Sequence, residues 1–360
     1  MKFYLFSFLL LFSIHSSTEY KFETVLDNLD DAWSFVFISE DKILFTEMPG
    51  KLKIASLSDK SIIDVENIPE VEYSSQGGLS EVILDPDFKF NNRIYISYSA
   101  KSDNNKITLF LSSAQLVNNR LVNSKVIFKA VASRKSSAHM GAKIAFLSDG
   151  SLLLTSGDGY DHREKAQKLD NHFGKIIRIN TDGSIPQDNP FILNKNALPE
   201  IYSYGHRNMQ GLIVTSDGLI YEHEHGPKGG DELNIIQPSL NYGWPAITYG
   251  IDYSGAVISP FTQKEGMEQP LLYWNPSIAP SDMIYYEKDL YPEFNKSFLI
   301  TALVSRDVKQ VNLQKPDQKQ KSLFTELNLR LRNIQDSPKG YIYLLSDGPN
   351  NKLIKVLPKK

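Results

Sequence analysis

Residues 143–159, KIAFLSDGSLLLTSGDG, place an apolar run on each side of a turn at Asp149 and Gly150. Two apolar runs joined by Asp-Gly are typical of a β-hairpin, because these two residues tolerate the left-handed backbone that a tight turn requires. The stretch therefore predicts two neighbouring antiparallel strands.

The second run of this hairpin has five counterparts elsewhere in the chain. In each copy a turn residue precedes an apolar strand, and several copies follow another partly apolar run, as at residues 32–40, 211–217 and 331–339. The intervals between copies, about 45 to 80 residues, leave room for two more strands per unit. The six copies are DKILFTE (41–47), NRIYISY (92–98), GSLLLTS (150–156), GLIYEHE (218–224), KSFLITA (296–302) and GYIYLLS (340–346).

Six such units, without a convincing long amphipathic helix, predict an all-β fold, a six-bladed β-propeller of four-stranded antiparallel blades. We expect residues 18–360 to form this single domain. A two-sheet sandwich is the main alternative, but its strands would recur every eight to twelve residues or so.

The composition excludes several classes of function. The 39 basic and 42 acidic residues give a net charge of −3 without a long block of like charges, which argues against a nucleic-acid partner. Cysteine is absent, which excludes disulfides, thiol catalysis and cysteine-ligated metals. Residues 1–17, MKFYLFSFLLLFSIHSS, have the layout of a cleaved signal peptide and are too short for a comfortable membrane span. We therefore expect a periplasmic or secreted protein without stable membrane insertion.

His139 precedes one strand of the opening hairpin, and Asp158 follows the other, so both residues should lie at the same end of the hairpin. A carboxylate that orients a histidine fixes its tautomer and stabilises the imidazolium, which makes His139 a candidate general base. Taken alone, a histidine at this place is more often a loop or capping residue.

Basic residues mark two further strands. Arg207 and Asn208 stand at a strand entry and could bind carboxylate or quinone oxygens, or form an inter-blade salt bridge and a turn cap. Arg330 and Arg332 alternate along a strand and so face one side, which suggests a shared anion. The alternative is an exposed strand face.

The run EHEHGPKGGDE (222–232) could bind a metal. His223 and His225 share a strand face, but zinc would require further ligands that the sequence does not make evident. Oxygen donors from the Gly226 and Pro227 carbonyls and the Glu232 carboxylate fit calcium better. On this interpretation His206, His223 and His225 are mainly structural.

The motifs resemble those of the soluble aldose sugar dehydrogenases, the glucose/sorbosone dehydrogenase-like six-bladed propellers that use pyrroloquinoline quinone (PQQ). The resemblance covers nearly the whole chain after residue 17. The most specific motifs are AHMGAKIAFLSDGSLLLTSGD (138–158), YGHRNMQGL (204–212), EHGPKGGDELN (224–234), NYGWP (241–245) and RLRNIQDSPKGYIYLLSD (330–347).

The resemblance implies a role for each matching residue. His139 would take the proton of the sugar C1 hydroxyl while hydride passes to the quinone, and Asp158 would orient it. Calcium would be held by Gly226 and Pro227 at the quinone, and by Glu232 and Tyr242 at a second, structural site. The cofactor contacts would be Gln76, Arg207, Asn208, Tyr253, Arg330 and Arg332.

Three positions depart from the family pattern. Val304 stands where the family places a lysine that faces the cofactor, Met140 replaces a polar residue, and Lys143 replaces an arginine. These changes would weaken cofactor binding or mark a member that has drifted from dehydrogenase activity.

The first hypothesis is therefore a dehydrogenase that oxidises aldoses to lactones and passes electrons to a quinone or another acceptor, as a monomer or homodimer. A calcium-dependent lactonase and a catalytically silent propeller that binds glycans or a protein are the alternatives.

Overall fold

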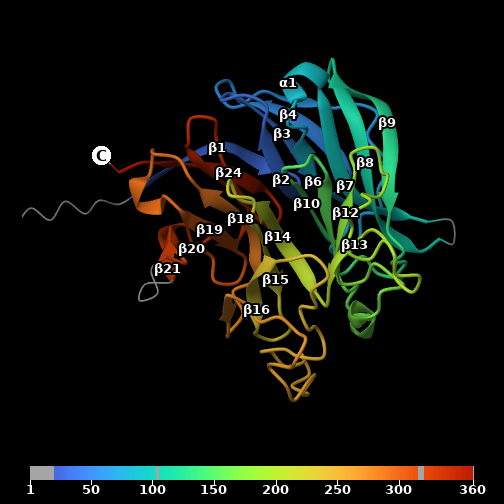
Figure 1. Ribbon diagram of the computed structural model, residues 1–360. Helices are drawn as coiled ribbons and strands as arrows, with labels where there is room; N and C mark the ends of the chain where they lie inside the picture. Colours follow the sequence, from blue (N-terminus) through green and yellow to red (C-terminus); the bar gives the residue numbers. More distant parts are fainter. Residues whose placement is uncertain (1–19, 103–104, 315–319, 360) are drawn as a thin grey trace, which may run out of the picture.

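The computed structural model describes residues 20–102, 105–314 and 320–359, so the expected signal peptide at 1–17 lies outside the described residues. Within these ranges the strands form six four-stranded antiparallel sheets (Figure 1). Each sheet contacts the next through its innermost strand, here called its first strand. The first strand of the sixth sheet contacts the first strand of the first sheet, which closes a ring. The predicted six-bladed propeller is confirmed.

The sheets run outward from these first strands in chain order. The first two consist of β2 (Ala32–Phe37), β3 (Lys42–Glu47), β4 (Lys51–Ser56) and β5 (Ile62–Asp64), and of β6 (Leu79–Leu84), β7 (Arg93–Lys101), β8 (Ile107–Val117) and β9 (Arg120–Lys129). The third and fourth consist of β10 (Gly141–Phe146), β11 (Leu152–Ser156), β12 (Lys175–Ile179) and β13 (Ile201–Tyr204), and of β14 (Asn208–Val214), β15 (Ile220–His225), β16 (Asp231–Ile236) and β17 (Leu272–Trp274). The fifth consists of β18 (Pro280–Tyr286), β19 (Ser297–Ala302), β20 (Val308–Val311) and β21 (Gln320–Leu323).

The sixth sheet joins the two ends of the described chain. Its strands are β22 (Leu331–Asp336), β23 (Ile342–Ser346), β24 (Asn351–Leu357) and β1 (Lys21–Leu29), and β1 pairs antiparallel with β24. In Figure 1 the blue strand accordingly lies beside the red one. Among the described residues, short helices occupy four connections, namely α1 (Phe88–Asn91), η1 (Arg163–Gln167), η2 (Pro292–Phe294) and η4 (Thr325–Leu327).

The six recurring segments of the sequence are the second strands of the six sheets. These strands are β3, β7, β11, β15, β19 and β23, and most of their residues are buried. A second strand is covered on both faces by neighbouring sheets, so its sequence is a nearly continuous apolar run. This burial explains why these strands gave the clearest repeat.

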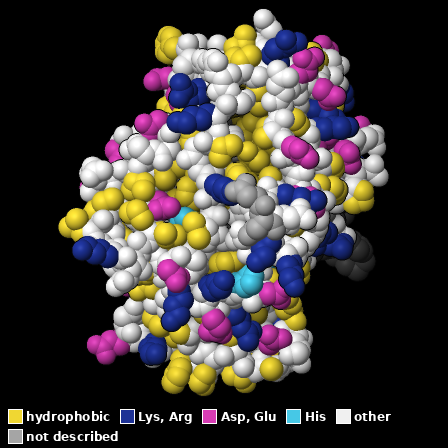
Figure 2. Space-filling view, turned by 90° about the vertical axis from the view of Figure 1, so that its right-hand side faces the viewer, with side chains coloured by type: hydrophobic (Ala, Val, Ile, Leu, Met, Phe, Trp, Pro, Cys, Tyr) yellow, Lys and Arg dark blue, Asp and Glu magenta, His cyan; other side chains and the backbone are white. Residues whose placement is uncertain are grey.

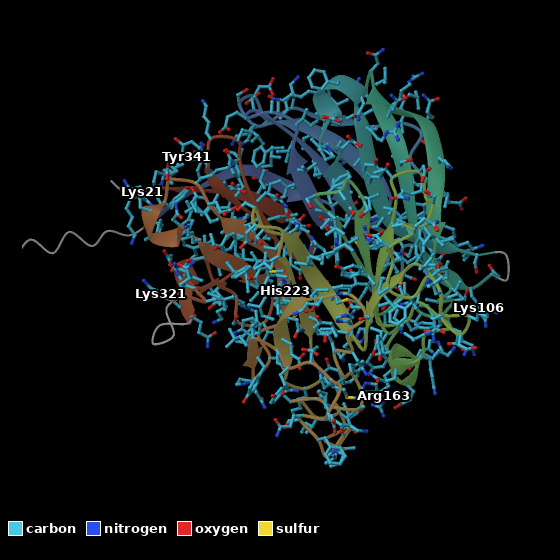
Figure 3. The ribbon with its side chains drawn as sticks, in the orientation of Figure 1. Lys21, Lys106, Arg163, His223, Lys321 and Tyr341 are labelled. Carbon is cyan, nitrogen blue, oxygen red and sulfur yellow. The ribbon has the colours of Figure 1, made fainter. Side chains whose placement is uncertain are left out.

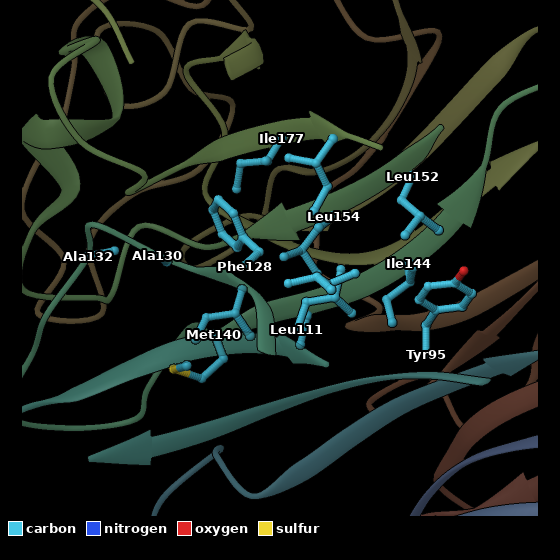
Figure 4. Close-up of a cluster of buried hydrophobic side chains, with 14 of the residues drawn as sticks. Tyr95, Leu111, Phe128, Ala130, Ala132, Met140, Ile144, Leu152, Leu154 and Ile177 are labelled. Atoms are coloured by element: carbon cyan, nitrogen blue, oxygen red, sulfur yellow. The ribbon is translucent and has the colours of Figure 1, made fainter. Parts of the chain in front are cut away.

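The hydrophobic core is divided among the spaces between neighbouring sheets. One cluster joins Tyr95 and Leu111 of the second sheet to Ile144, Leu154 and Ile177 of the third (Figure 4). Because each sheet packs on two neighbours, the ring as a whole holds every first strand in place.

Each first strand carries a register shift against its second strand near its beginning. The shifts fall between Ala32 and Ser34, Leu79 and Val82, Gly141 and Ile144, Met209 and Gly211, Pro280 and Asp282, and Leu331 and Asn333. Bulges of this kind bend a strand and re-aim its side chains. Six of the twelve candidate site residues lie at or within three positions before these bulges, namely Gln76, His139, Arg207, Asn208, Arg330 and Arg332.

The surface carries no large field of one sign on the face in Figure 2, where Lys and Arg are interspersed with Asp and Glu. Across the described ranges, none of the helices has the length and apolar character needed to cross a membrane.

Candidate active site

His139 is held by its backbone in an unusual conformation. Its φ is 49°, in the left-handed region that non-glycine residues rarely adopt. The His139 N–H donates to Gln76 Oε1 over 2.8 Å, and its carbonyl accepts from Arg134 Nη1 over 2.9 Å. Strained residues fixed in this way cluster at functional sites.

The His139 side chain pairs with Asp158, as the hairpin predicted. Nδ1 of His139 lies 2.7 Å from Oδ1 of Asp158, and both side chains are buried. The carboxylate is fixed on its other side, because Trp244 Nε1 donates to Oδ2 over 2.7 Å and the Tyr160 N–H donates to Oδ1 over 2.9 Å. With Nδ1 committed to Asp158, Nε2 is the nitrogen available to a substrate.

Burial and pairing set the protonation of these two groups. Burial lowers the pKa of His139 below its ordinary value, although the Asp158 hydrogen bond opposes the shift. Burial alone would raise the pKa of Asp158, but the His139 hydrogen bond and nearby charges bring it below the ordinary value. The pair is therefore a neutral imidazole beside a carboxylate at neutral pH, the state that a general base requires.

Arg207 enters the same site from the start of the fourth sheet. Its carbonyl accepts the Asp158 N–H over 2.7 Å, and its Nη1 donates to the carbonyls of His225 and Gly226 over 2.8 and 2.6 Å. Its Nε is buried without a hydrogen-bond partner in the described part of the chain. Since a buried donor without an acceptor is costly, this atom fits an anionic or carbonyl ligand.

Arg330 and Arg332 share an anion, as their spacing suggested, but that anion belongs to the chain itself. Asp347 accepts from Arg330 Nε over 2.7 Å and from Arg332 Nε and Nη2 over 2.8 and 2.5 Å. The Arg332 guanidinium also lies over the Trp33 ring, 4.2 Å from its centroid. The two arginines and one carboxylate leave a single net positive charge here.

Three cavities bring the predicted residues together. A cavity of about 240 Å³ is lined by Gln76, Asn208, Arg330 and Arg332, and one of about 280 Å³ by His139, Asp158, Arg207 and Tyr253. A third of about 520 Å³ is lined by Gly226, Pro227 and Tyr253. The second and third share Pro227 and Tyr253, and the first and third share His225.

The predicted calcium ligands lie at two places. Gly226 and Pro227 border the third cavity. Glu232 and Tyr242 lie elsewhere, on the side of the fourth sheet that packs on the third. The Tyr242 hydroxyl is occupied, because it donates to the Ile235 carbonyl and accepts from the Gln237 N–H, so Tyr242 could bind a cation only through its carbonyl.

The three departures from the family pattern have different surroundings. Val304 is 59% exposed at the rim of the third cavity, where it adds no charge. Met140 is buried in the hydrophobic cluster of Figure 4 and also borders the first cavity. Lys143 is buried between Glu81 and Asp282, with Nζ 2.5 and 2.8 Å from their oxygens.

Three residues that hold the site were missed by the sequence analysis. They are Arg134, Trp244 and Asp347, which contact His139, Asp158 and Arg332 respectively, and only Trp244 comes from a distant segment. Trp244 and Asp347 lie within quoted motifs, NYGWP and YLLSD, which could have singled them out. Arg134 has no such signal.

Comparison with known proteins shows that the chain is similar to sugar dehydrogenases. The aldose sugar dehydrogenase YliI of Escherichia coli is 35% identical over 94% of this chain and 92% of its own. The crystal structure of the apo-form of the soluble aldose sugar dehydrogenase from Escherichia coli superposes with a TM-score of 0.89 at 33% identity, covering 94% of this chain and 99% of that one.

A more distant relative is the quinoprotein glucose dehydrogenase B of Acinetobacter calcoaceticus, 28% identical over 68% of this chain and 56% of its own. The family model described as Glucose / Sorbosone dehydrogenase matches residues 29–355. The chain therefore belongs to the glucose/sorbosone dehydrogenase family.

Proposed function

We propose that the protein is a calcium- and PQQ-dependent dehydrogenase that oxidises aldoses at C1 to lactones. The observation that carries the proposal is the His139–Asp158 pair, 2.7 Å apart and facing the same cavity as Arg207. Sugar dehydrogenase relatives support the substrate class, and the quinoprotein name of the Acinetobacter calcoaceticus relative supports the cofactor.

The residues present fit an anionic quinone. Arg207, whose Nε is unpaired, lines the second cavity with Tyr253, and Asn208, Arg330, Arg332 and Gln76 line the first; both cavities share lining residues with the third. Gly226 and Pro227 would supply carbonyl oxygens to calcium. When bound, PQQ would supply the two-electron acceptor for the hydride that leaves C1 of the sugar.

The chain itself would handle the proton. Nε2 of His139 would accept the proton of the C1 hydroxyl as the C1–H bond breaks and the C1–O bond becomes a carbonyl. Asp158 would keep the ring in the tautomer with the proton on Nδ1 and stabilise the imidazolium that forms. Trp244 and Tyr160 would hold the carboxylate still during this transfer, through the hydrogen bonds described above.

We further propose that the protein is exported and that it contains a second, structural calcium ion. The leader-like sequence of residues 1–17 supports export to the periplasm or beyond. Electrons would leave to a quinone or another acceptor, and Glu232 with the Tyr242 carbonyl would hold a structural calcium.

Reconstitution tests the proposal. The purified protein is mixed with PQQ and Ca²⁺, and reduction of a redox dye is followed with a panel of aldoses. We expect sugar-dependent reduction that disappears in His139→Ala. Failure to bind PQQ, together with hydrolysis of lactones, would replace the proposal with the lactonase alternative. Absence of both activities would favour a binding propeller.

A further inference from the structure

Arg134 is a buried cation close to the His139–Asp158 pair, and it has no part in the proposed proton transfer. Its side chain is 2% exposed and is one of the largest fully buried side chains among the described residues. Its backbone is fixed, because Arg134 and Ile107 each donate an N–H to the other's carbonyl over 2.9 Å at the beginning of β8, next to Lys106 in Figure 3. Arg134 is not among the described residues that line the three cavities, so it acts from outside them.

The Arg134 guanidinium holds the backbone segment that presents His139. Nη1 donates to the His139 carbonyl over 2.9 Å, and Nε donates to the Ala132 carbonyl over 3.1 Å. The Phe173 ring lies under the guanidinium, with its centroid 4.9 Å from Cζ. A planar group with several donors in a fixed geometry can bind two carbonyls at once, which a single amine cannot do in the same way. Arg134 therefore fixes the left-handed backbone of His139 relative to residues 132–134.

Two glycines bring the other member of the pair against the same groups. A Cβ at Gly157 would lie 2.2 Å from the His139 carbonyl oxygen, and a Cβ at Gly159 would lie 3.3 Å from Arg134 Nη1. These glycines flank Asp158 in the sequence. The end of the hairpin that carries the carboxylate thus packs directly on the His139 carbonyl and on the guanidinium. The relative position of both members of the pair therefore depends on Arg134.

The charge of Arg134 has no direct carboxylate partner. No acid in the described ranges forms an ion pair with it, and its Nη2 has no hydrogen-bond partner there. Burial lowers the pKa of Arg134 to about 10, and the charge of Asp158 opposes this shift, so the side chain is a cation at neutral pH. A buried cation without a partner is costly, and an apolar side chain would fill the same space at lower cost. This cost indicates that the charge serves the site.

The charge acts on the His139 ring. Burial lowers the pKa of His139 most, and the charges of Arg207 and Arg134 lower it further, against the hydrogen bond and charge of Asp158. The other charged and titratable groups around His139 line the second cavity, namely Tyr160, Asp161, Arg163 (labelled in Figure 3), Asp252 and Tyr253.

We propose that Arg134 is a positioning residue of the active site, which fixes His139 through its carbonyl and keeps a permanent positive charge beside the His139–Asp158 pair. Because a nearby cation disfavours the imidazolium, Arg134 keeps His139 free of a proton before the sugar binds. The effect on turnover rests on the proposed function. The effect on the protonation of the His139 ring does not.

The first test requires neither cofactor nor substrate. The full protein without cofactor is prepared with isotope-labelled histidine, and the nuclear magnetic resonance signals of the His139 ring, identified by their loss in His139→Gln, are followed from about pH 4 to about pH 8. In Arg134→Gln, which removes the charge, the midpoint of the His139 titration should rise by roughly 0.5 to 1 unit. In Arg134→Lys, which keeps the charge, the midpoint should stay at the wild-type value.

The second test measures turnover of the PQQ-loaded protein. Both Arg134→Gln and Arg134→Lys should lower kcat by roughly 10- to 100-fold, because the base is displaced by a fraction of an ångström or more. The KM for the sugar and the Kd for PQQ should change by less than about three-fold, since Arg134 does not line the cavities. In Arg134→Gln alone, the acid limb of kcat/KM should move to higher pH with the His139 titration. A wild-type protein that titrates as expected but oxidises no sugar would refute the proposed function and leave the charge effect of Arg134 established.

Arg178→Gln is the matched control. Arg178 is a buried arginine on β12 of the same sheet, but it binds Asp149 and Asp188 at the turn end of the hairpin, away from His139. Its replacement removes a buried guanidinium from the third sheet without touching the His139 backbone. Neither the His139 midpoint nor kcat should change in this variant.

Three outcomes would overturn the inference. They are an unchanged His139 midpoint in Arg134→Gln, a loss of kcat no larger than that in Arg178→Gln, and a loss that comes entirely from weaker PQQ binding. If Arg134→Gln does not fold, Arg134→Lys decides, because it keeps the charge and loses the two-carbonyl contact. A kcat at the wild-type level in Arg134→Lys would then contradict the positioning role.

Discussion

Trp244, in the loop between β16 and β17 of the fourth sheet, donates its indole N–H over 2.7 Å to Asp158, which follows the second strand of the third sheet. The orientation of His139 thus depends on two neighbouring sheets. Removal of this hydrogen bond in Trp244→Phe should lower kcat by about 10-fold or more, because the carboxylate gains freedom to rotate. Steady-state dye reduction measures the loss. Trp274→Phe is the matched control, since the Trp274 N–H bonds Gln320 in an outer strand; an equal loss there would contradict a local role for Trp244.

Asp158→Asn should reduce kcat by about 10²- to 10⁴-fold while the fold is kept. The amide can donate a hydrogen bond to Nδ1, which favours the tautomer with the proton on Nε2 and blocks the proposed base. Kinetics with the PQQ-loaded protein measure kcat, and fluorescence titration measures PQQ affinity. A variant that loses activity only through weaker PQQ binding would argue against an orienting role.

The pH dependence should follow the lowered pKa of His139. Because the folded protein binds this proton less readily than a free histidine, the acid limb of kcat/KM should fall below pH 6.5. The same shift makes the unfolded chain bind more protons as the pH drops, so His139 contributes stability above about pH 6.5 that is lost towards the folded pKa. Activity and urea unfolding between pH 4 and 8 or so test both effects. An acid limb above pH 6.5 would contradict the shift.

Val304→Lys should strengthen PQQ binding. The side chain is exposed at the rim of the third cavity, and a lysine there would add a positive charge near a trianionic cofactor. An exposed pair contributes up to about 1 kcal/mol, so the dissociation constant should fall several-fold, and less at high salt. Val126→Lys, an equally accessible position on β9, controls for net charge. The same gain in Val126→Lys would show a long-range effect only.

Lys175→Met should destabilise the third sheet. The buried Lys175 Nζ donates to the carbonyls of Lys165, Ala166 and Phe173 over 3.2, 2.9 and 2.5 Å. A methionine leaves these acceptors without a donor, at a cost of about 1–3 kcal/mol. Chemical unfolding at constant pH gives the change. A variant as stable as wild type would mean that burying the ammonium costs as much as its bonds contribute.

Local sequence patterns were sufficient to predict the six second strands and the His139–Asp158 pair. Each of these features lies within one hairpin, where the apolar runs and the turn residues are close together in the sequence. The contact of Arg330 and Arg332 with Asp347 was predicted in part, since their alternation along a strand places both arginines on one face of the sheet. Their anion was missed, although Asp347 follows the second strand of the hairpin that Arg330 precedes, which is how Asp158 stands to His139.

The strand β1 and the proximity of His206 to Glu224 could be identified only from the structure. β1 escaped notice because it is largely exposed at the edge of its sheet and so lacks an apolar run. His206 Nδ1 and Glu224 Oε2 lie 3.9 Å apart only because β14, which His206 precedes, pairs with β15. Spacing alone suggested His223 and His225 instead, and His225 Nε2 lies 2.7 Å from the Pro280 carbonyl, to which it can donate.

The pairing of β1 with β24 imposes an order on how the molecule is made. Within the described residues, β1 pairs only with β24, so it has no partner strand until residues 351–357 follow it, more than 320 positions later. The sixth sheet can therefore be completed only after residues 351–357 have been made, and the ring of six sheets cannot close before then. Until then, the first and fifth sheets lack the complete sixth sheet against which they pack.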